Sequence, residues 1–386
     1  MFNFVYHNPV KVVFGKGTIA KLANLVKMDQ KIMMTCGAGG SIRQNGVYDQ
    51  IMDALEGHSV VEFGGIEPNP RYEICMEAVK KAKSERVDFL LSAGGGSILD
   101  ATKFIAAAIR YDEGKDPWDI VGKRAPVTSA VPLGCIMTLP ATGSEMNSIA
   151  VISRESTLEK LPFSSRHIYP QFSIIDPETT YSLPKRQVIN GIVDTFAHVV
   201  EQYLTYDVNT PLQDRQAEAI LLTLIEEAPE VLKDPKNYDV RANLAWCATH
   251  GLNGLIACGV PQDWSTHMIG HELTALHGLD HGQSLAVLLP AVLHHQRKEK
   301  GTKLLQYGRR VWKIEGLGHD ETINTAITRT IDFFKSVGMH TRLSDYNITP
   351  SDCMTVAERF EQRGVKLGEH QAIGKREIEE ILALCA

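Results

Sequence analysis

The hydrophobic pattern of the chain changes near residue 177. Before this point, short β-branched and apolar runs alternate with amphipathic stretches of helical spacing, which indicates a parallel sheet with flanking helices. After it the strand signals cease and long amphipathic segments follow, such as residues 216–233, 241–257, 325–337 and 353–363. We therefore predict an α/β domain over residues 1–177 and an all-α domain over residues 178–386.

The order of elements in the first domain follows from the same pattern. Asn69 followed by Pro70 predicts the N-terminal cap of one helix, because proline is favoured at the first helical position. The predicted strands are residues 31–36, 58–65, 87–93 and 131–137, and the predicted helices are residues 47–57, 71–86 and 97–110.

A glycine turn, residues 94–97, joins the predicted strand 87–93 directly to a helix. Glycine lets the backbone approach an anion closely, and the free N–H groups of a helix start stabilise negative charge. The alternative is a structural role, in which the glycines are present only because a tight turn has no room for side chains. The polar loop from Thr138 to Asn147, after another apolar strand, adds hydroxyl and amide groups suited to phosphate and ribose oxygens.

A second glycine-rich loop, residues 36–43, follows the strand at which nucleotide folds usually meet the adenosine ribose. An acid at such a strand end binds the 2′-hydroxyl of NAD, whereas small residues with a nearby cation admit the 2′-phosphate of NADP. Residues 35–43 contain no acid and include Ser41 and Arg43. This composition favours NADP(H).

Histidines and one aspartate are placed for metal binding in the second half of the chain. Asp194 and His198 are four residues apart on a predicted helix, so they share one face. Four of the 14 histidines lie within residues 267–281. A single histidine on such a helix is more often structural, but this density together with a hard oxygen donor predicts a divalent metal site. The histidines of the second group are His267, His271, His277 and His281.

Composition excludes several other classes. The formal net charge is −6, which gives no electrostatic footprint for nucleic acid. Seven scattered cysteines without a Cys-x-x-Cys pair argue against disulfides and a thiolate zinc site. The apolar stretch 285–293 is interrupted by Pro290 and is too short to cross a bilayer, and the amino terminus lacks a secretory pattern. We expect a cytoplasmic enzyme that binds neither membrane nor nucleic acid.

The chain resembles the iron-containing (group III) alcohol dehydrogenases over essentially its full length, and is most similar to their NADPH-dependent butanol dehydrogenase and broad aldehyde reductase subgroup. The segments that carry the resemblance are FGKGT (14–18), FGGIEPNP (63–70), AGGGSILDATKFIA (93–106), LPATGSEMN (139–147), DPETTYSLPKRQ (176–187), NGIVDTFAHVVEQY (190–203) and HMIGHELTALHGLDHG (267–282). It implies a Rossmann-like nucleotide-binding domain, an all-α metal-binding domain and a dehydroquinate synthase-like architecture.

The resemblance also implies a function and its residues. The expected reaction is hydride transfer between NADP(H) and a short- to medium-chain aldehyde or primary alcohol, in a homodimer that holds one Fe²⁺ or Zn²⁺. The implied metal ligands are Asp194, His198, His267 and His281, the implied catalytic residues are His271 and Asp194, and His277 is structural. The implied cofactor-binding residues are Gly95, Gly96, Ser97, Asp100, Thr138, Thr142, Asn147 and Lys160, with Gly37, Gly39, Gly40 and Ser41 as a looser match.

Two other classes compete with this interpretation. A metal- and NAD-dependent lyase of the dehydroquinate synthase type would need a cationic pocket, yet basic residues near the metal motifs are sparse. A non-catalytic nucleotide sensor would hold its metal in a closed structural site. Four apolar residues suggest a pocket for a small hydrophobic carbonyl compound, with core packing as the alternative: Ile149, Val151, Trp264 and Leu273.

Overall fold

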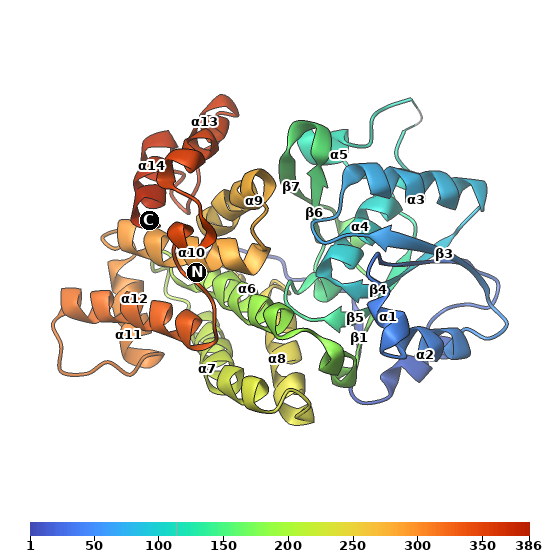
Figure 1. Ribbon diagram of the computed structural model, residues 1–386, viewed down its shortest axis with the longest axis horizontal. Helices are drawn as coiled ribbons and strands as arrows, with labels where there is room; N and C mark the ends of the chain where they lie inside the picture. The colour runs from blue at the N-terminus through green and yellow to red at the C-terminus, as the bar shows by residue number, and fades with distance from the viewer. Residues whose placement is uncertain (113) are drawn as a thin grey trace. The chain divides into compact units, whose positions relative to one another are not determined.

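The computed structural model describes residues 1–112 and 114–386, which form two compact units (Figure 1). The α/β unit comprises residues 7–184 and 235–249, and the helical unit comprises residues 1–6, 185–234 and 250–386. Neither unit is one continuous stretch of chain. The α/β unit extends beyond residue 177 because the 3₁₀ helix η5 (Pro177–Ser182) starts at the capping residue Asp176, directly after the last strand.

Residues 235–249 carry the first part of helix α8 (Tyr238–Gly251) and belong to the α/β unit rather than to the helical one. Two contacts explain this placement. The Thr249 hydroxyl donates a hydrogen bond of 2.5 Å to the fully buried carboxylate of Glu145. The ring of Trp246 packs edge-on against Phe14, with ring centroids 5.5 Å apart.

A six-stranded sheet, parallel throughout, is the frame of the α/β unit. The strand order is β1-β8-β5-β4-β2-β3, and every neighbouring pair is parallel. The predicted parallel sheet is confirmed. The strands are β1 (Lys11–Phe14), β2 (Lys31–Gly37), β3 (Ser59–Ile66), β4 (Phe89–Gly95), β5 (Leu133–Leu139) and β8 (Phe172–Ile175), and an antiparallel hairpin is formed by β6 (Ile149–Arg154) and β7 (Glu159–Ser164).

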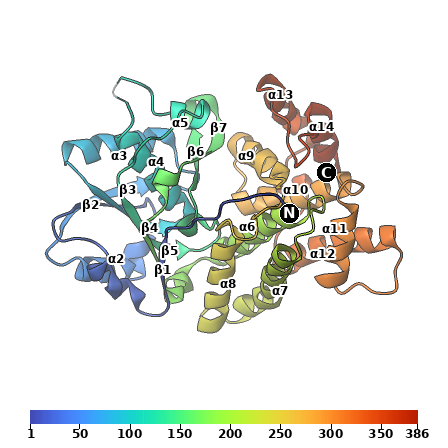
Figure 2. The same cartoon turned by 180° about the vertical axis from the view of Figure 1, so that it is seen from behind.

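Helices cover both faces of this sheet. Because side chains alternate along a strand, Met33 of β2 packs into one core while its neighbours Ile32 and Met34 pack into the other. The first core contains residues of α3 (Tyr72–Ser84) and α4 (Gly96–Ile109), and the second contains residues of η1 (Thr18–Asn24) and α2 (Val47–Ala54). Figure 2 shows α3 and α2 on opposite sides of the sheet. The short helices α1 (Ser41–Gln44) and α5 (Asp119–Gly122) lie in connections between strands.

The start of α3 differs from the prediction. The N-cap residue is Arg71, and the helix begins at Tyr72. Asn69 has a positive φ of 56°, and its side-chain oxygen accepts a hydrogen bond from Lys160 Nζ at 2.8 Å. The prediction of Asn69 as the cap is therefore wrong, because its polar group is used by a distant lysine instead of by the first turn.

The second unit is helical, as predicted. Helix α8 ends at Gly251, before the predicted end at residue 257. Within the described residues, no helix combines the length and the apolar character that crossing a bilayer requires. The helices are α6 (Lys185–Tyr203), α7 (Pro211–Lys233), α9 (Ser265–His277), α10 (His281–His295), α11 (Gly301–Arg310), α12 (His319–Ser336), α13 (Met354–Gln362) and α14 (Lys375–Leu384).

Candidate metal centre and glycine turns

Helix α6 supplies two of the predicted metal ligands and, on the same face, a second acid. Asp194, His198 and Glu201 follow one another at helical spacing, and all three side chains are buried. Burial of three polar side chains requires partners for them. The ends of α9 and α10 provide those partners.

Helix α10 begins close to α6, and a glycine makes this approach possible. A Cβ at Gly282 would lie 2.8 Å from the Cα of Asn190, closer than packed atoms come. The N-cap Asp280 is held on the same side, because Arg186 donates two hydrogen bonds of 2.6 Å to it and Asn190 Nδ2 a third of 2.8 Å. His281, the first residue of α10, is thereby fixed beside α6.

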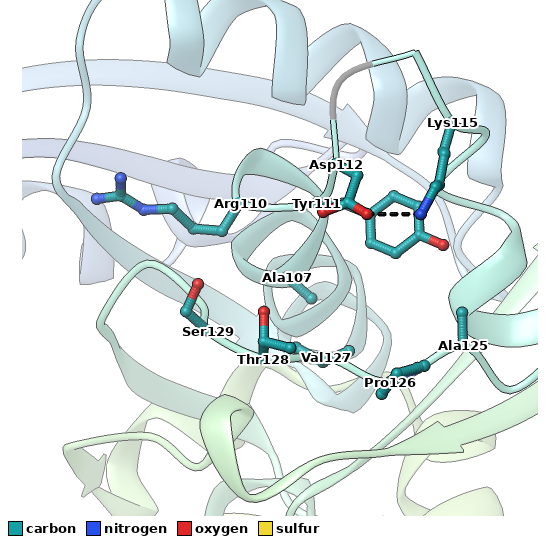
Figure 3. Close-up of a pocket in the computed structure, with 10 residues that line it drawn as sticks. All are labelled: Ala107, Arg110, Tyr111, Asp112, Lys115, Ala125, Pro126, Val127, Thr128 and Ser129. Carbon is teal, nitrogen blue, oxygen red and sulfur yellow. Dashed lines mark hydrogen bonds and ion pairs between the residues drawn. The ribbon is translucent and has the colours of Figure 1, made fainter.

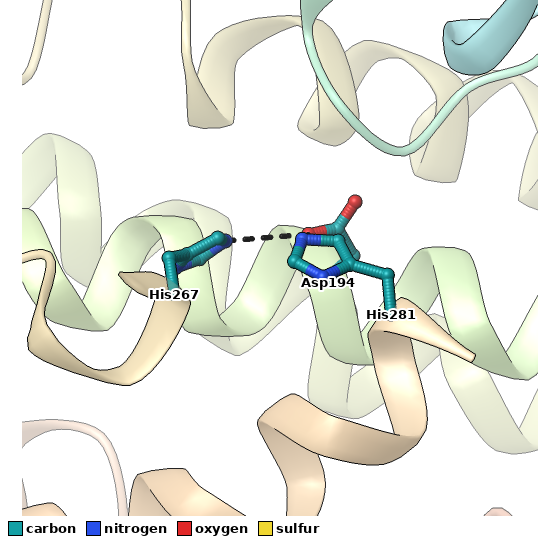
Figure 4. Close-up of side chains that lie close together, drawn as sticks. All are labelled: Asp194, His267 and His281. Carbon is teal, nitrogen blue, oxygen red and sulfur yellow. Dashed lines mark ion pairs between the residues drawn. The ribbon is translucent and has the colours of Figure 1, made fainter. Parts of the chain in front are cut away.

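Three side chains converge on one point (Figure 4). Asp194, His267 and His281 each offer a ligand atom, and these atoms all lie within 4.8 Å of one another. Asp194 Oδ1 lies 3.5 Å from His267 Nε2, 3.6 Å from His281 Nε2 and 3.5 Å from His198 Nδ1. His198 stands beside the group of three, with its ring stacked on that of His267 at a centroid distance of 4.4 Å.

These distances fit a bound ion better than a hydrogen-bonded network. Two ligands of one tetrahedral ion, each bound at about 2.0–2.2 Å, are separated by about 3.3–3.6 Å. Asp194 Oδ1, His198 Nδ1 and His267 Nε2 are buried and form no hydrogen bond with any described residue. Buried polar atoms without partners are costly, and a divalent cation would satisfy all three. Imidazoles with a carboxylate suit Fe²⁺ and Zn²⁺.

The two stacked histidines, His198 and His267, differ in pKa. Burial lowers the pKa of His198 to about 4, so this ring is neutral near pH 7. Burial also acts to lower the pKa of His267, but the charges of Glu201 and Asp194 raise it to about 9. Burial raises the pKa of Glu201, and His267 opposes that shift. Glu201 and His267 thus each favour the charged form of the other at the edge of the site.

The remaining histidines lie at different distances from this point. The buried ring of His271 is 5.3 Å from that of His281 and 6.5 Å from that of His267, between centroids. His277 is the last residue of α9, and Gly278 caps the helix with a φ of 71°. The structure does not group His277 with the converging side chains.

Trp264 and Leu273, two of the four apolar residues expected at a pocket, have different surroundings. The Trp264 ring packs edge-on against His267 and His198, at 5.4 and 6.1 Å between centroids. Leu273 is fully buried in a hydrophobic core, so its packing is that of a structural residue. Ile149 and Val151 lie half-buried on β6 of the α/β unit.

The glycine turn after β4 is packed rather than open. A Cβ at Gly96 would lie 2.5 Å from Thr142 Oγ1, and one at Gly95 would lie 2.9 Å from Leu139 Cβ. The turn therefore brings the start of α4 against residues 139–142. No described side chain caps α4, and its first turn contains no acid. The N–H groups of this turn, Ser97 included, remain suited to an anion.

A buried polar network holds the loop after β5 against α4. Ser144 Oγ donates to Asp100 Oδ1 at 2.7 Å, and Val151 N donates to Asp100 Oδ2 at 2.9 Å. Burial raises the pKa of Asp100, and Lys103 opposes this. Lys103, fully buried one turn later, donates to oxygens of Ser144, Asn147 and Ile149. Asp100 and Asn147 thus make hydrogen bonds within the protein, as Lys160 does through Asn69. Thr138 lies buried at the end of β5.

The loop after β2 is open, in contrast to the turn after β4. A Cβ at Gly39 or Gly40 would meet nothing within 4 Å, and Gly40 has a φ of 63°. Gly37 is more enclosed, with Ile98 Cδ1 3.5 Å from such a Cβ. Ser41 begins the short helix α1.

Arg43 of the same helix has partners that sequence reasoning did not include. Its guanidinium lies 3.7 Å above the ring of Tyr48 and pairs with the carboxylate of Glu62, which also accepts from the Tyr48 hydroxyl. Glu62 lies on β3, beside β2 in the sheet. An acid therefore stands near this loop even though residues 35–43 contain none.

A separate cavity of about 160 Å³ lies in the α/β unit (Figure 3). An ion pair of 2.7 Å joins Lys115 and Asp112 at its rim. None of the predicted site residues lines it, so it bears on neither the metal nor the cofactor. Its lining consists of Ala107, Arg110, Tyr111, Asp112, Lys115 and residues 125–129.

Two residues of the site escaped sequence reasoning. Glu201 lies seven residues after Asp194, so helical spacing could have placed it with Asp194 and His198. Lys103 lies three residues after Asp100 on the same helix face. A glutamate or lysine on a helix usually faces solvent, and burial is not visible in the sequence.

Comparisons with known proteins agree with this arrangement. The family model described as iron-containing alcohol dehydrogenase matches residues 9–177, and the model of the C-terminal domain of the Fe-containing alcohol dehydrogenase family matches residues 188–385.

Individual relatives cover nearly the whole chain. The NADPH-dependent aldehyde reductase YqhD of Escherichia coli is 54% identical over 377 residues, 97% of each chain. A probable NADH-dependent butanol dehydrogenase 1 of Bacillus subtilis is 39% identical and covers 99% of each chain. The crystal structure of E. coli YqhD superposes with a TM-score of 0.98, covering 100% of this chain and 99% of that one at 52% identity.

Proposed function

This chain belongs to the iron-containing alcohol dehydrogenase family, and we propose that it is a metal-dependent, NADPH-dependent aldehyde reductase that also oxidises the corresponding primary alcohols. The observation that carries the proposal is the convergence of His198, His267 and His281 on Asp194 Oδ1. The named activity of the E. coli relative supports the same assignment. The substrate class is a short- to medium-chain aldehyde.

The metal-binding residues of the proposal are Asp194, His198, His267 and His281. When bound, a divalent ion supplies a Lewis acid that polarises the carbonyl oxygen of the aldehyde. The chain's own contribution is to hold one buried carboxylate, the two buried imidazoles of His198 and His267 and the half-buried imidazole of His281 close together. Such preorganisation lowers the cost of binding.

The coenzyme-binding residues fall into two groups. The uncapped start of α4, with Gly95, Gly96 and Ser97, offers backbone N–H groups to the pyrophosphate. Asp100 acts differently, because its carboxylate orders the loop that carries Thr142 and the other polar groups of residues 138–147. NADPH, when bound, supplies the hydride.

The proton that completes aldehyde reduction is assigned to His271. Its buried ring lies 5.3 Å from that of His281 between centroids, beside the proposed metal ligands. An imidazole titrates near the working pH, so it can donate a proton directly or through a water. Asp194 takes part in the reaction only as a ligand in this account.

The choice of NADP over NAD depends on the open loop at residues 37–43. Gly37, Gly39, Gly40 and Ser41 leave space for a 2′-phosphate, and Arg43 offers it a cation. Since Arg43 is paired with Glu62, the phosphate must compete with that carboxylate. Several relatives at 34–39% identity are named as NADH-dependent, whereas the E. coli relative at 54% identity is named as NADPH-dependent. Coenzyme choice is therefore best tested at this loop.

Kinetics with both coenzymes test the proposal. We expect turnover of butyraldehyde with NADPH and a much lower kcat/KM with NADH. Loss of one charge-assisted hydrogen bond of about 1.5–3 kcal/mol predicts that Arg43→Ala lowers kcat/KM for NADPH by about 10- to 100-fold and leaves NADH unaffected. Equal losses of kcat/KM with the two coenzymes would mean that Arg43 does not bind the 2′-phosphate.

Assembly and location complete the proposal. We propose a homodimer, because the N-terminal segment exposes Phe2, Phe4 and Val5, apolar surface that a second copy would cover. All seven cysteines are free thiols, which suits the cytoplasm. The acidic net charge of −6 argues against a nucleic-acid partner. Light scattering on a gel-filtration column would show the oligomeric state directly.

A further inference from the structure

We infer that Glu201 is a positioning residue of the metal centre, whose carboxylate fixes the ring of His267 so that Nε2 is presented beside Asp194. The inference rests on the metal site proposed above. Glu201 contacts the ring of His267 and the backbone of Thr266, and it acts on the metal centre through these two contacts.

Both carboxylate oxygens of Glu201 are used on the first turn of α9. Oε2 contacts His267 Nδ1, and Oε1 accepts a hydrogen bond of 2.6 Å from the backbone N–H of Thr266. The side chain is 2% exposed, so water does not compete for either oxygen. Two bonds to adjacent residues fix both the position of the helix start and the rotation of the imidazole.

This contact decides which ring nitrogen is free. A carboxylate beside Nδ1 keeps the imidazole proton on that nitrogen, which leaves the lone pair of Nε2 for a metal. Nε2 is the atom that lies 3.5 Å from Asp194 Oδ1. Metal-binding histidines generally donate their second N–H to such a partner, and the partner raises the basicity of the ligand.

The loop before α9 is held by the same part of α6. The backbone N–H of Asp263 donates to the carbonyl of Glu201 at 3.0 Å, and the Asp263 carboxylate accepts from Ser265 N at 3.0 Å. Lys300, itself 1% exposed, pairs with Asp263 at 2.9 Å. Trp264, between Asp263 and Ser265 in the sequence, has a positive φ of 63°, which a residue with a side chain of this size rarely adopts. A strained residue persists only where its surroundings determine it, so the loop is built to a fixed geometry.

Metal affinity in the full-length protein tests the inference. Zn²⁺ affinity would be measured by competition with a chromogenic chelator for the wild type, Glu201→Gln and Glu218→Gln. Glu218 is a matched control, a 7%-exposed carboxylate on α7 that accepts from Tyr203 and Arg310 and touches no proposed ligand. We expect Glu201→Gln to bind Zn²⁺ about 10- to 100-fold more weakly, the usual cost of losing such a partner.

The readouts separate positioning from general stability. Glu201→Asp, which keeps the charge, is expected to recover part of the Zn²⁺ affinity, while Glu218→Gln changes only the melting temperature of the metal-free protein. Wild-type affinity in Glu201→Gln would overturn the inference, as would equal losses of affinity in both glutamine variants. A wild-type protein that takes up no Zn²⁺ would instead refute the proposed metal site itself.

A measurement on the unmodified protein covers the case in which Glu201→Gln does not fold. The ¹⁵N spectrum of histidine-labelled, Zn²⁺-loaded protein reports which nitrogen of each ring carries a proton. We expect His267 to carry it on Nδ1 and to bind Zn²⁺ through Nε2. A proton on Nε2, or Zn²⁺ bound through Nδ1, would contradict the role assigned to Glu201.

Discussion

The Lys103 ammonium donates hydrogen bonds to both the backbone oxygen and the side-chain oxygen of Asn147, at 2.9 and 3.0 Å. It also donates to the backbone oxygens of Ser144 and Ile149, at 2.7 and 2.8 Å. Burial lowers the pKa of Lys103 to about 8, against the opposing effect of Asp100. A single buried cation thus holds the whole loop that the coenzyme is proposed to meet.

Replacing Lys103 with methionine is expected to destabilise the protein strongly. The substitution removes the ammonium donor from the backbone oxygens of Ser144, Asn147 and Ile149, at about 1–3 kcal/mol for each oxygen left unpaired. Urea unfolding would measure the loss, and NADPH affinity should fall with it because the loop loosens. Lys123→Met is the control, since Lys123 is 76% exposed and its pairing with Asp119 contributes little. Equal stability of the two variants would contradict this account of the loop.

Removing one proposed ligand should abolish metal binding, whereas removing a nearby histidine should not. His281 lies 3.6 Å from Asp194 Oδ1, and His277, at the end of α9, lies outside the converging group. Loss of a residue that only supports a metal ligand weakens metal binding by about 10- to 100-fold. We expect His281→Ala, which removes a ligand itself, to weaken metal binding by more than that. His277→Ala should keep its metal and its turnover. Metal content after dialysis measures both, and metal retained by His281→Ala would remove it from the ligand set.

Metal uptake should release a proton that comes from His267. Its pKa, which burial lowers and the charges of Glu201 and Asp194 raise to about 9, lies above neutrality, so the metal-free site is protonated there. Apparent affinity should therefore increase with pH up to about 9 and level off above it. His198, with a pKa lowered to about 4 by burial, is already neutral and releases nothing. Titration calorimetry at pH 7 in two buffers counts the protons, and a count of none or two would contradict this assignment.

The assignment of His271 as proton donor predicts a change in the pH profile. General acid catalysis contributes about 10²- to 10⁴-fold to rate, so His271→Ala should lower kcat by that order. The variant should also lose one limb of the kcat profile while its metal content stays normal. Initial rates across the pH range check this. A largely intact kcat with an unchanged profile would exclude His271 from the relay.

Much of the fold could be predicted from local pattern. The alternation of apolar runs and helical stretches predicted the parallel sheet, because the hydrophobic periods of strands and helices can be recognised within short stretches of sequence. The assignment of residues 1–6 and 235–249 could not be predicted in this way. It depends on distant contacts such as Thr249 with Glu145 and Phe2 N with Gly259 O, which leave no periodic trace.

The candidate site was predictable to a similar degree. Spacing along α6 and the dense histidines indicated where a metal would bind, since both are local features. The close approach of Gly282 to Asn190 and the packing of Gly96 on Thr142 bring distant segments together, and no local rule predicts them. Glu201 and Lys103 were missed because their roles follow from burial, which tertiary packing decides.

Metal removal and restoration test the central claim most directly. The purified protein would be stripped with a chelator, its metal content measured, and NADPH consumption followed with butyraldehyde before and after addition of Fe²⁺ or Zn²⁺. We expect turnover to disappear with the metal and to return when one of these ions is added. Undiminished turnover in protein shown to contain no metal would contradict it, as would the absence of turnover with any aldehyde and either ion.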